Sequence, residues 1–98
     1  MSGHYTLYKV DDPYCGDSGG MSYTFKTKFD GQSYQHYDES NNARPEIGKY
    51  IRVGSVFART MQAQDWWQTN EIVEILEDAP KRVKFKTKSG SIYEWTTT

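Results

Sequence analysis

The stretch VKFKTKSGSIYEW, residues 83 to 95, decides the fold because it has the pattern of a complete β-hairpin. Apolar residues alternate with polar and charged ones on both sides of Ser89-Gly90, and this period of two is typical of strands. Ser and Gly between two such runs are turn residues. The chain is therefore predicted to close on a pair of antiparallel strands.

The length of the turn determines which side chains of this hairpin share a face. A two-residue turn would place Tyr93 and Trp95 among the lysines, as a platform on which bases could stack. A three-residue turn instead sets Lys84 opposite Glu94 and joins the two aromatic residues to the apolar side chains of the first strand. Only this second register buries every apolar residue together, and it places Gly90 at the left-handed position such turns require. We therefore predict that Tyr93 and Trp95 belong to the core.

The same period recurs through the rest of the chain. Residues 23–29 alternate aromatic residues with Thr and Lys, and Asp30-Gly31 followed by the run 33–37 predicts a second hairpin. Further predicted elements are strands at 49–59, 71–76, 82–88 and 91–96 and a polar loop at 38–46. The sequence predicts one all-β domain over residues 1–98, a small antiparallel barrel with at most one or two short helical turns.

Composition limits the class of protein. The aromatic share of 15% is large beside a total hydrophobic share of 36%, which predicts an aromatic core and not a disordered chain. A domain of 98 residues buries a limited fraction of its surface, so a homo-oligomer is one expected way to bury more. Cys15 has no partner for a disulfide, and no apolar run reaches the length of a membrane span. We expect a soluble, cytoplasmic protein that does not contact membranes.

The string CGDSGG, residues 15–20, resembles the nucleophile signature of chymotrypsin-like serine proteases, which would cast Ser18 as the nucleophile. That family needs two barrels and a scaffold of roughly 200 residues, which this chain does not provide. Asp, Ser and Gly are also the residues of turns, and we expect a turn here. The His and Cys residues lack metal-ligand spacing, and no phosphate-binding loop is present. The sequence predicts no catalytic residue, no metal and no cofactor.

The charged residues lie in bands, although the net charge is only −1. Basic residues gather in the segments 49–59 and 81–88, and acidic ones dominate 63–80. If the two basic strands lie side by side, they form a stripe that could bind nucleic acid, which is the alternative function the sequence offers. A solvated strand face with lysines that protect a sheet edge explains the same pattern.

The tandem pair Trp66-Trp67 is the best candidate for a binding site. Consecutive residues of a strand point to opposite faces, so one tryptophan is expected to lie at least partly exposed. Trp67 shares the parity of the apolar residues that follow and is expected to turn inward, leaving Trp66 as the anchor for a partner. Arg52, Lys84 and Lys86 are the expected polar rim. A bulge after the pair would exchange the two roles.

The segment QDWWQTNEIVEIL resembles the Trp pair of Src-homology-3 domains, in which the first Trp helps to bind proline-rich peptides. The resemblance implies a small barrel with similar strand lengths in the C-terminal half of the chain. The ALYDY motif of that family is absent, so the resemblance implies the barrel and not the ligand.

The closing pattern VKFKTKSGSIYE, preceded by EIVEIL, resembles the ends of small uncharacterised proteins encoded by large tailed phages. The resemblance covers about the last third of the chain. It implies an accessory or host-takeover protein that acts by binding a protein inside the host cytoplasm. The function predicted from the sequence is accordingly a non-catalytic binding module.

Overall fold

Two antiparallel sheets make up the computed structural model, which describes residues 4–54 and 66–98 apart from the side chain of Pro13. Within those ranges the chain forms nine strands and no helix, which confirms the all-β prediction. The predicted strand at 49–59 is seen from 50 to 54, and its remaining residues lie outside the described ranges. The strands are β1 (Tyr5–Lys9), β2 (Asp12–Gly19), β3 (Met21–Phe29), β4 (Tyr34–Asn41), β5 (Tyr50–Gly54), β6 (Trp66–Gln68), β7 (Ile72–Ala79), β8 (Arg82–Thr87) and β9 (Ile92–Thr97).

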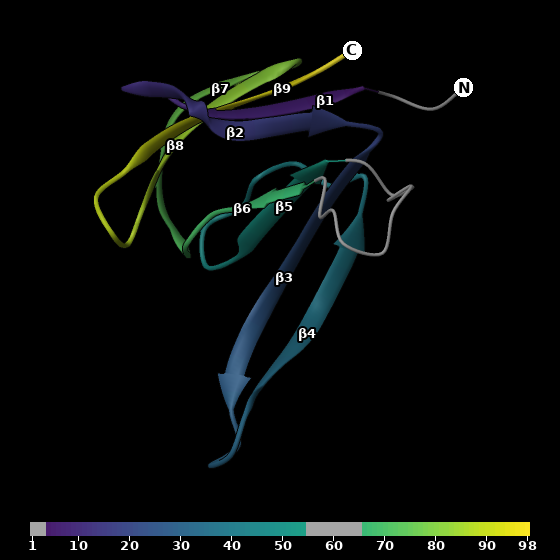
Figure 1. The fold of residues 1–98 in the computed structure, drawn as a ribbon, viewed down its shortest axis with the longest axis vertical. Helices are drawn as coiled ribbons and strands as arrows, with labels where there is room; N and C mark the ends of the chain where they lie inside the picture. Colours follow the sequence, from purple (N-terminus) through teal and green to yellow (C-terminus); the bar gives the residue numbers. More distant parts are fainter. Residues whose placement is uncertain (1–3, 55–65) are drawn as a thin grey trace.

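The larger sheet has the strand order β2-β1-β9-β8-β7 and lies across the top of the view in Figure 1. Its centre joins the two ends of the chain, because β1 pairs with β9 and sets Tyr5 opposite Thr97. Beyond these strands, the backbone N–H of His4 donates to the Thr98 hydroxyl over 3.1 Å. The first and last strands of the sequence are therefore neighbours in the same sheet.

The closing hairpin of β8 and β9 has the register predicted from its three-residue turn. Lys84 lies opposite Glu94, while the apolar residues pair on the other face. The N–H of Thr87 donates to the Ser91 carbonyl over 2.9 Å, and Gly90 has a φ of 92°, a conformation that favours glycine. Tyr93 and Trp95 are buried, as expected from this register, so they form no exposed stacking platform.

The smaller sheet has the order β4-β3-β5-β6, and its β3–β4 hairpin extends well beyond the body of the protein in Figure 1. The hairpin was predicted, but its return strand continues to Asn41, so the expected loop at 38–46 is wrong for its first four residues. The pairing of β3 with β4 continues beyond residue 38 because a β-bulge accommodates the extra residue there, and Asp38 has a φ of 53°. Thr24 then pairs with Ser40.

Two corners carry the chain from one sheet to the other. At the first, Gly20 alone separates β2 from β3. At the second, the chain passes from β6 to β7, and the backbone of Ile72 bonds both to the Gly48 N–H over 2.8 Å and to the Lys49 carbonyl over 2.9 Å. These corners give the fold a barrel-like outline, although the described strands do not close a barrel.

The core lies between the sheets and is rich in aromatic side chains, as the composition predicted. It consists of Tyr5, Leu7, Ile51, Val53, Ile72, Val83, Phe85, Tyr93 and Trp95, with Trp67 and Ile75 packed against it. One buried polar group bridges the sheets: the Ser22 hydroxyl accepts the indole N–H of Trp95 over 3.0 Å and donates to the Ala43 carbonyl over 2.7 Å. The largest core side chain is thus hydrogen-bonded as well as packed.

The first five residues of the string CGDSGG, 15–19, belong to β2, so the predicted turn is wrong there, and only Gly20 lies at the corner between β2 and β3. The Asp, Ser and Gly residues of this β2 segment pair with β1, where Ser18 lies opposite Thr6. Gly16 lies so close to β1 that an added Cβ would collide with the Leu7 carbonyl oxygen. Gly16 therefore allows β1 and β2 to approach closely. The local sequence, which has the composition of a turn, does not predict this contact.

A candidate binding surface on the four-stranded sheet

The two faces of β3 differ in chemistry in an unexpected way. Its small polar residues, Ser22 and Thr24, point into the core and are fully buried. Its aromatic residues have the opposite parity and lie on the outer face of the sheet. Neighbouring strands add further rings to this outer face, which we call the outer aromatic row: Tyr23, Phe25, Phe29, Tyr34, His36, Tyr50 and Trp66.

Phe25 is the centre of the outer aromatic row and has no exposed surface, although it lies outside the core cluster. Three rings stack on it, with centroid distances of 3.9 Å to His36, 5.1 Å to Tyr23 and 5.6 Å to Tyr50. Phe25 is therefore buried by the row itself, which forms a second aromatic cluster on the opposite side of the sheet from the core.

Arg52 joins Trp66 to this cluster. Its guanidinium lies 4.0 Å from the centre of the Trp66 ring and within 6 Å of the rings of Tyr23 and Phe25, which is the range of cation–π attraction. The Gln68 side chain holds it in place by accepting a 2.7 Å hydrogen bond from Nη2. Burial lowers the pKa of Arg52 from its ordinary value, and the group remains a cation at every physiological pH.

Tyr23 carries the row's most perturbed titratable group. Its hydroxyl donates to the Glu39 carboxylate on β4. Burial, followed by this hydrogen bond and the negative charge of Glu39, raises the pKa of Tyr23 to about 12. The hydroxyl is thus a fixed hydrogen-bond donor at neutral pH, and it ties β4 to the ring cluster.

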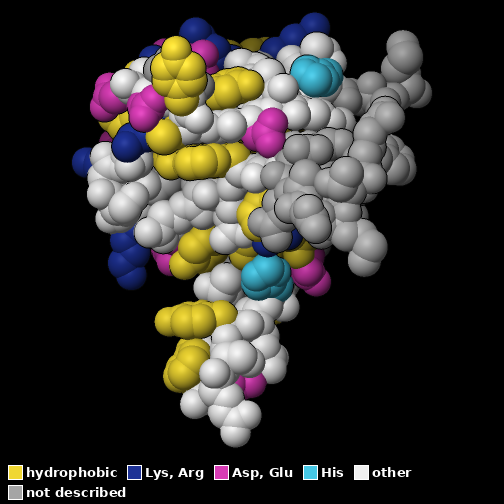
Figure 2. Space-filling view, in the orientation of Figure 1, with side chains coloured by type: hydrophobic (Ala, Val, Ile, Leu, Met, Phe, Trp, Pro, Cys, Tyr) yellow, Lys and Arg dark blue, Asp and Glu magenta, His cyan; other side chains and the backbone are white. Residues whose placement is uncertain are grey.

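The far end of the row is the part most open to solvent. Phe29 and Tyr34 are 57% and 71% exposed, and their rings lie 5.1 Å apart on facing positions of the hairpin. On the opposite face of the same hairpin, the Lys28 ammonium lies 5.7 Å from the centre of the Tyr37 ring. Figure 2 shows hydrophobic side chains along the projecting hairpin. Exposed rings of this size on a protruding element are typical of an interaction surface.

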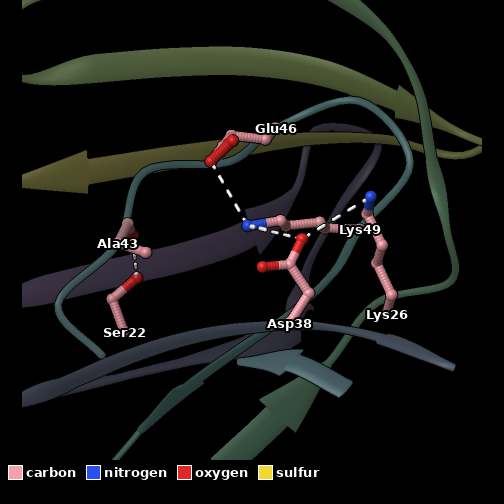
Figure 3. Close-up of polar contacts among 6 residues, drawn as sticks. All are labelled: Ser22, Lys26, Asp38, Ala43, Glu46 and Lys49. Atoms are coloured by element: carbon pink, nitrogen blue, oxygen red, sulfur yellow. Dashed lines mark hydrogen bonds and ion pairs between the residues drawn. The ribbon is translucent and has the colours of Figure 1, made fainter. Parts of the chain in front are cut away.

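The base of the hairpin is held by buried charge. The ammonium of Lys49 is 3.5 Å from the Glu46 carboxylate and 3.9 Å from that of Asp38, which also pairs with Lys26 over 3.5 Å. Figure 3 shows Lys49 reaching between the two carboxylates. Because Lys49 is only 7% exposed, these partners compensate a charge removed from water, and they connect β4 to the segment before β5.

The predicted site residues lie in three different parts of the structure. Trp66 and Arg52 lie together on the outer face of the four-stranded sheet. Trp67 packs against the core, which confirms the predicted parity of the pair. Lys84 and Lys86 lie on β8 in the other sheet, so they form no rim around Trp66. The rings around Phe25 were not predicted to belong to a site. The alternation of aromatic residues in 23–29 was the signal that could have identified them.

The basic stripe expected from segments 49–59 and 81–88 does not form between the described strands. β5 and β8 belong to different sheets, because the chain passes from one sheet to the other at Gly20 and returns at the corner before Ile72. On β8, Lys84 lies between Glu77 and Glu94 and so faces acidic residues on both sides. The β8 lysines are therefore part of a mixed-charge face.

No family model, no curated protein and no solved structure matches this chain. Among the residues that the structure describes, no helix is long and apolar enough to cross a membrane. Within the same ranges, no group of three or more His, Cys, Asp or Glu residues is arranged to hold a metal ion. The likeness to Src-homology-3 domains and to phage proteins therefore stays a prediction.

Proposed function

We propose that this chain is a non-catalytic binding module that holds a protein partner on the outer aromatic row. The observation that carries the proposal is the Arg52 guanidinium stacked on the Trp66 ring at 4.0 Å, beside rings that the core does not use. Trp, Tyr and Arg are the side chains that most often supply the binding energy of protein interfaces. The row together with Arg52 presents all three on one sheet face.

A protein partner fits the charges of this surface better than a nucleic acid does. Arg52 lies over the row, but Glu39 lies beside Tyr23 and Asp30 lies at the tip of the hairpin, and carboxylates repel phosphates. The lysines of β8 are in the other sheet, opposite acidic residues. The alternative function, nucleic-acid binding, required the basic strands 49–59 and 81–88 to lie side by side. Their described residues lie in different sheets and do not form that surface.

The proposed setting is the one that the sequence resemblance implies. We infer that the partner is a protein of a bacterial cytoplasm, and that the chain acts there as an accessory protein of a tailed phage. A coding sequence placed among phage genes would support this setting, and one placed among cellular metabolic genes would contradict it.

The test is capture of partners from a bacterial lysate with the tagged chain, followed by an affinity measurement with the purified partner. Trp66→Ala is expected to weaken that affinity by about 2 kcal/mol or more, with little change in the free energy of unfolding. Trp67→Ala is the matched control: it is expected to cost about 3 kcal/mol of stability because that ring packs on the core.

Two results would overturn the proposal. One is a purified partner whose affinity is the same for Trp66→Ala and for the unchanged chain. The other is tight binding of single-stranded DNA or RNA that falls steeply as salt is raised, since a steep salt dependence is the mark of phosphate contacts.

A further inference from the structure

The four outer edges of the two sheets are β2, β7, β4 and β6, and three of them are blocked or short. β6 is three residues long. β7 has two bulges, and its glutamates and aspartate place several negative charges along the edge. β2 includes a proline at position 13 and packs beside β6. Bulges, like charges and proline are the usual means by which sheet edges avoid pairing with other chains.

β4 is the exception among these edges. It is eight residues long, and nearly all its residues are exposed. Its bulge and its two carboxylates lie in the half nearer the body of the protein. The outer half, residues 34–37 with the sequence YQHY, has no carboxylate, lysine or arginine. This segment is a regular, aromatic and uncharged edge with none of the protective features of the other three.

The free edge offers backbone groups at known positions. The Asp30 N–H donates to the Ser33 carbonyl over 3.2 Å at the end of the hairpin. Because hydrogen-bonded and non-hydrogen-bonded pairs alternate in an antiparallel ladder, Gln35 then bonds toward β3 and His36 directs its N–H and carbonyl away from it. A second strand could therefore bond to the backbone of His36 without disturbing the hairpin.

We propose that this chain forms a homodimer in which the β4 strands of two copies pair antiparallel along the segment 34–37. A twofold axis perpendicular to the sheet sets the uncharged segment against itself, so no charge is buried and no like charges meet. A second copy of this chain brings the same neutral and aromatic segment, so the pairing needs no complementary charge from a different protein. Among the described strands no edge other than that of β4 is open in this way, and the pairing occupies it, so assembly stops at two copies.

The proposed dimer uses the β4 end of the outer aromatic row and leaves the Trp66 end free for a partner. The outer aromatic rows of the two copies lie on the same face of the joined sheet, and Trp66 lies at the far edge of each sheet from β4. Loss of dimerisation and loss of partner binding are therefore separate results. Trp66→Ala is expected to remain dimeric.

The test is sedimentation equilibrium of the full chain from low micromolar to submillimolar concentration. His36→Pro removes the outward N–H, and the matched control His36→Ala loses the same imidazole but keeps that N–H. We expect the unchanged chain to dimerise, and His36→Pro to weaken the dimer at least tenfold more than His36→Ala does. Far-UV circular dichroism checks that both variants keep the strand signal.

If His36→Pro does not fold, a second pair of variants at Tyr34 tests the same edge. Tyr34→Lys puts a charge on each copy's edge and should weaken the dimer at least tenfold more than Tyr34→Ser, which loses the same ring without adding a charge. A chain that stays monomeric at submillimolar concentration overturns the proposal, and so does open-ended assembly. The proposal is also overturned if the two members of a folded variant pair, His36→Pro with His36→Ala or Tyr34→Lys with Tyr34→Ser, weaken the dimer equally. Loss of the dimer in Trp66→Ala would overturn it as well.

Discussion

The molecule contains two aromatic clusters that are built in opposite ways. The core cluster lies between two sheets, and its rings come from strands distant in sequence, such as Tyr5 and Trp95 with centroids 5.8 Å apart. The outer aromatic row lies on one sheet, and its rings come mainly from the single β3–β4 hairpin and its neighbour β5. Burial alone therefore does not define the core, since Phe25 is as fully buried as Trp95.

The two clusters should respond differently to truncation of their central ring, and the core should respond more strongly. Trp95→Ala removes a side chain that is 1% exposed and contacts both sheets, so we expect a loss of about 4 kcal/mol in the free energy of unfolding. Denaturant unfolding measured by circular dichroism checks this. A loss below about 1.5 kcal/mol would show that the sheets hold together without this ring.

Phe25→Ala tests whether the outer row stabilises the hairpin alone. We expect a loss of about 3 kcal/mol, because the ring is fully buried beneath its neighbours. Amide hydrogen exchange should accelerate most in β3 and β4, since a two-stranded ribbon is marginally stable without side-chain packing. Phe29→Ala is the control and should change stability by less than about 0.5 kcal/mol, because Phe29 is mostly exposed. Faster exchange across both sheets would mean that the clusters are one unit.

The hydrogen bond between the Ser22 hydroxyl and the Trp95 indole links the polar face of β3 to the core. Ser22→Ala leaves the buried N–H without that acceptor, so we expect a loss of about 1 to 2 kcal/mol. Denaturant unfolding of this variant and of Ser33→Ala, whose side chain is exposed, gives the comparison. Equal stability of the two variants would show that the indole finds another acceptor or tolerates having none.

The smallest expected effect concerns pH. Because folding raises the pKa of Tyr23 from about 10 to about 12, the folded state favours the neutral phenol. That stabilisation is complete below pH 10, where the unfolded chain is also neutral, and is lost as the pH rises through about 12. Ultraviolet titration should show one tyrosine ionising late, and Tyr23→Phe should lack this late step and have a shallower alkaline loss of stability. An unchanged titration in the variant would contradict the assignment.

The closing hairpin could be predicted from the sequence because its determinants are local. Gly90 fixes the turn, and alternation on either side then determines that Lys84 opposes Glu94. The parity of Trp66 and Trp67 followed from the same period. In contrast, β2 has the composition of a turn, and only its close pairing with β1 at Gly16 makes it a strand.

The placement of the candidate site depended on contacts that no local pattern shows. Alternation in 23–29 identified which side chains share a face, but not which face is turned to the core. That choice depends on Trp95, because small residues such as Ser22 leave room for its ring. The basic stripe failed for a related reason: the corners between the sheets, not strand order in the sequence, determine which strands become neighbours.

The pairing of β1 with β9 has a consequence for how the chain folds during synthesis. β1 and β2 leave the ribosome before the other described strands, yet β1 has one open edge until residues 92–97 have emerged. The larger sheet is therefore completed late, after a loop spanning most of the sequence has closed, and such long-range pairing is slow. Until then the N-terminal hairpin exposes an unpaired strand, so we expect refolding in milliseconds to seconds and a nascent chain that is prone to aggregate until β9 is made.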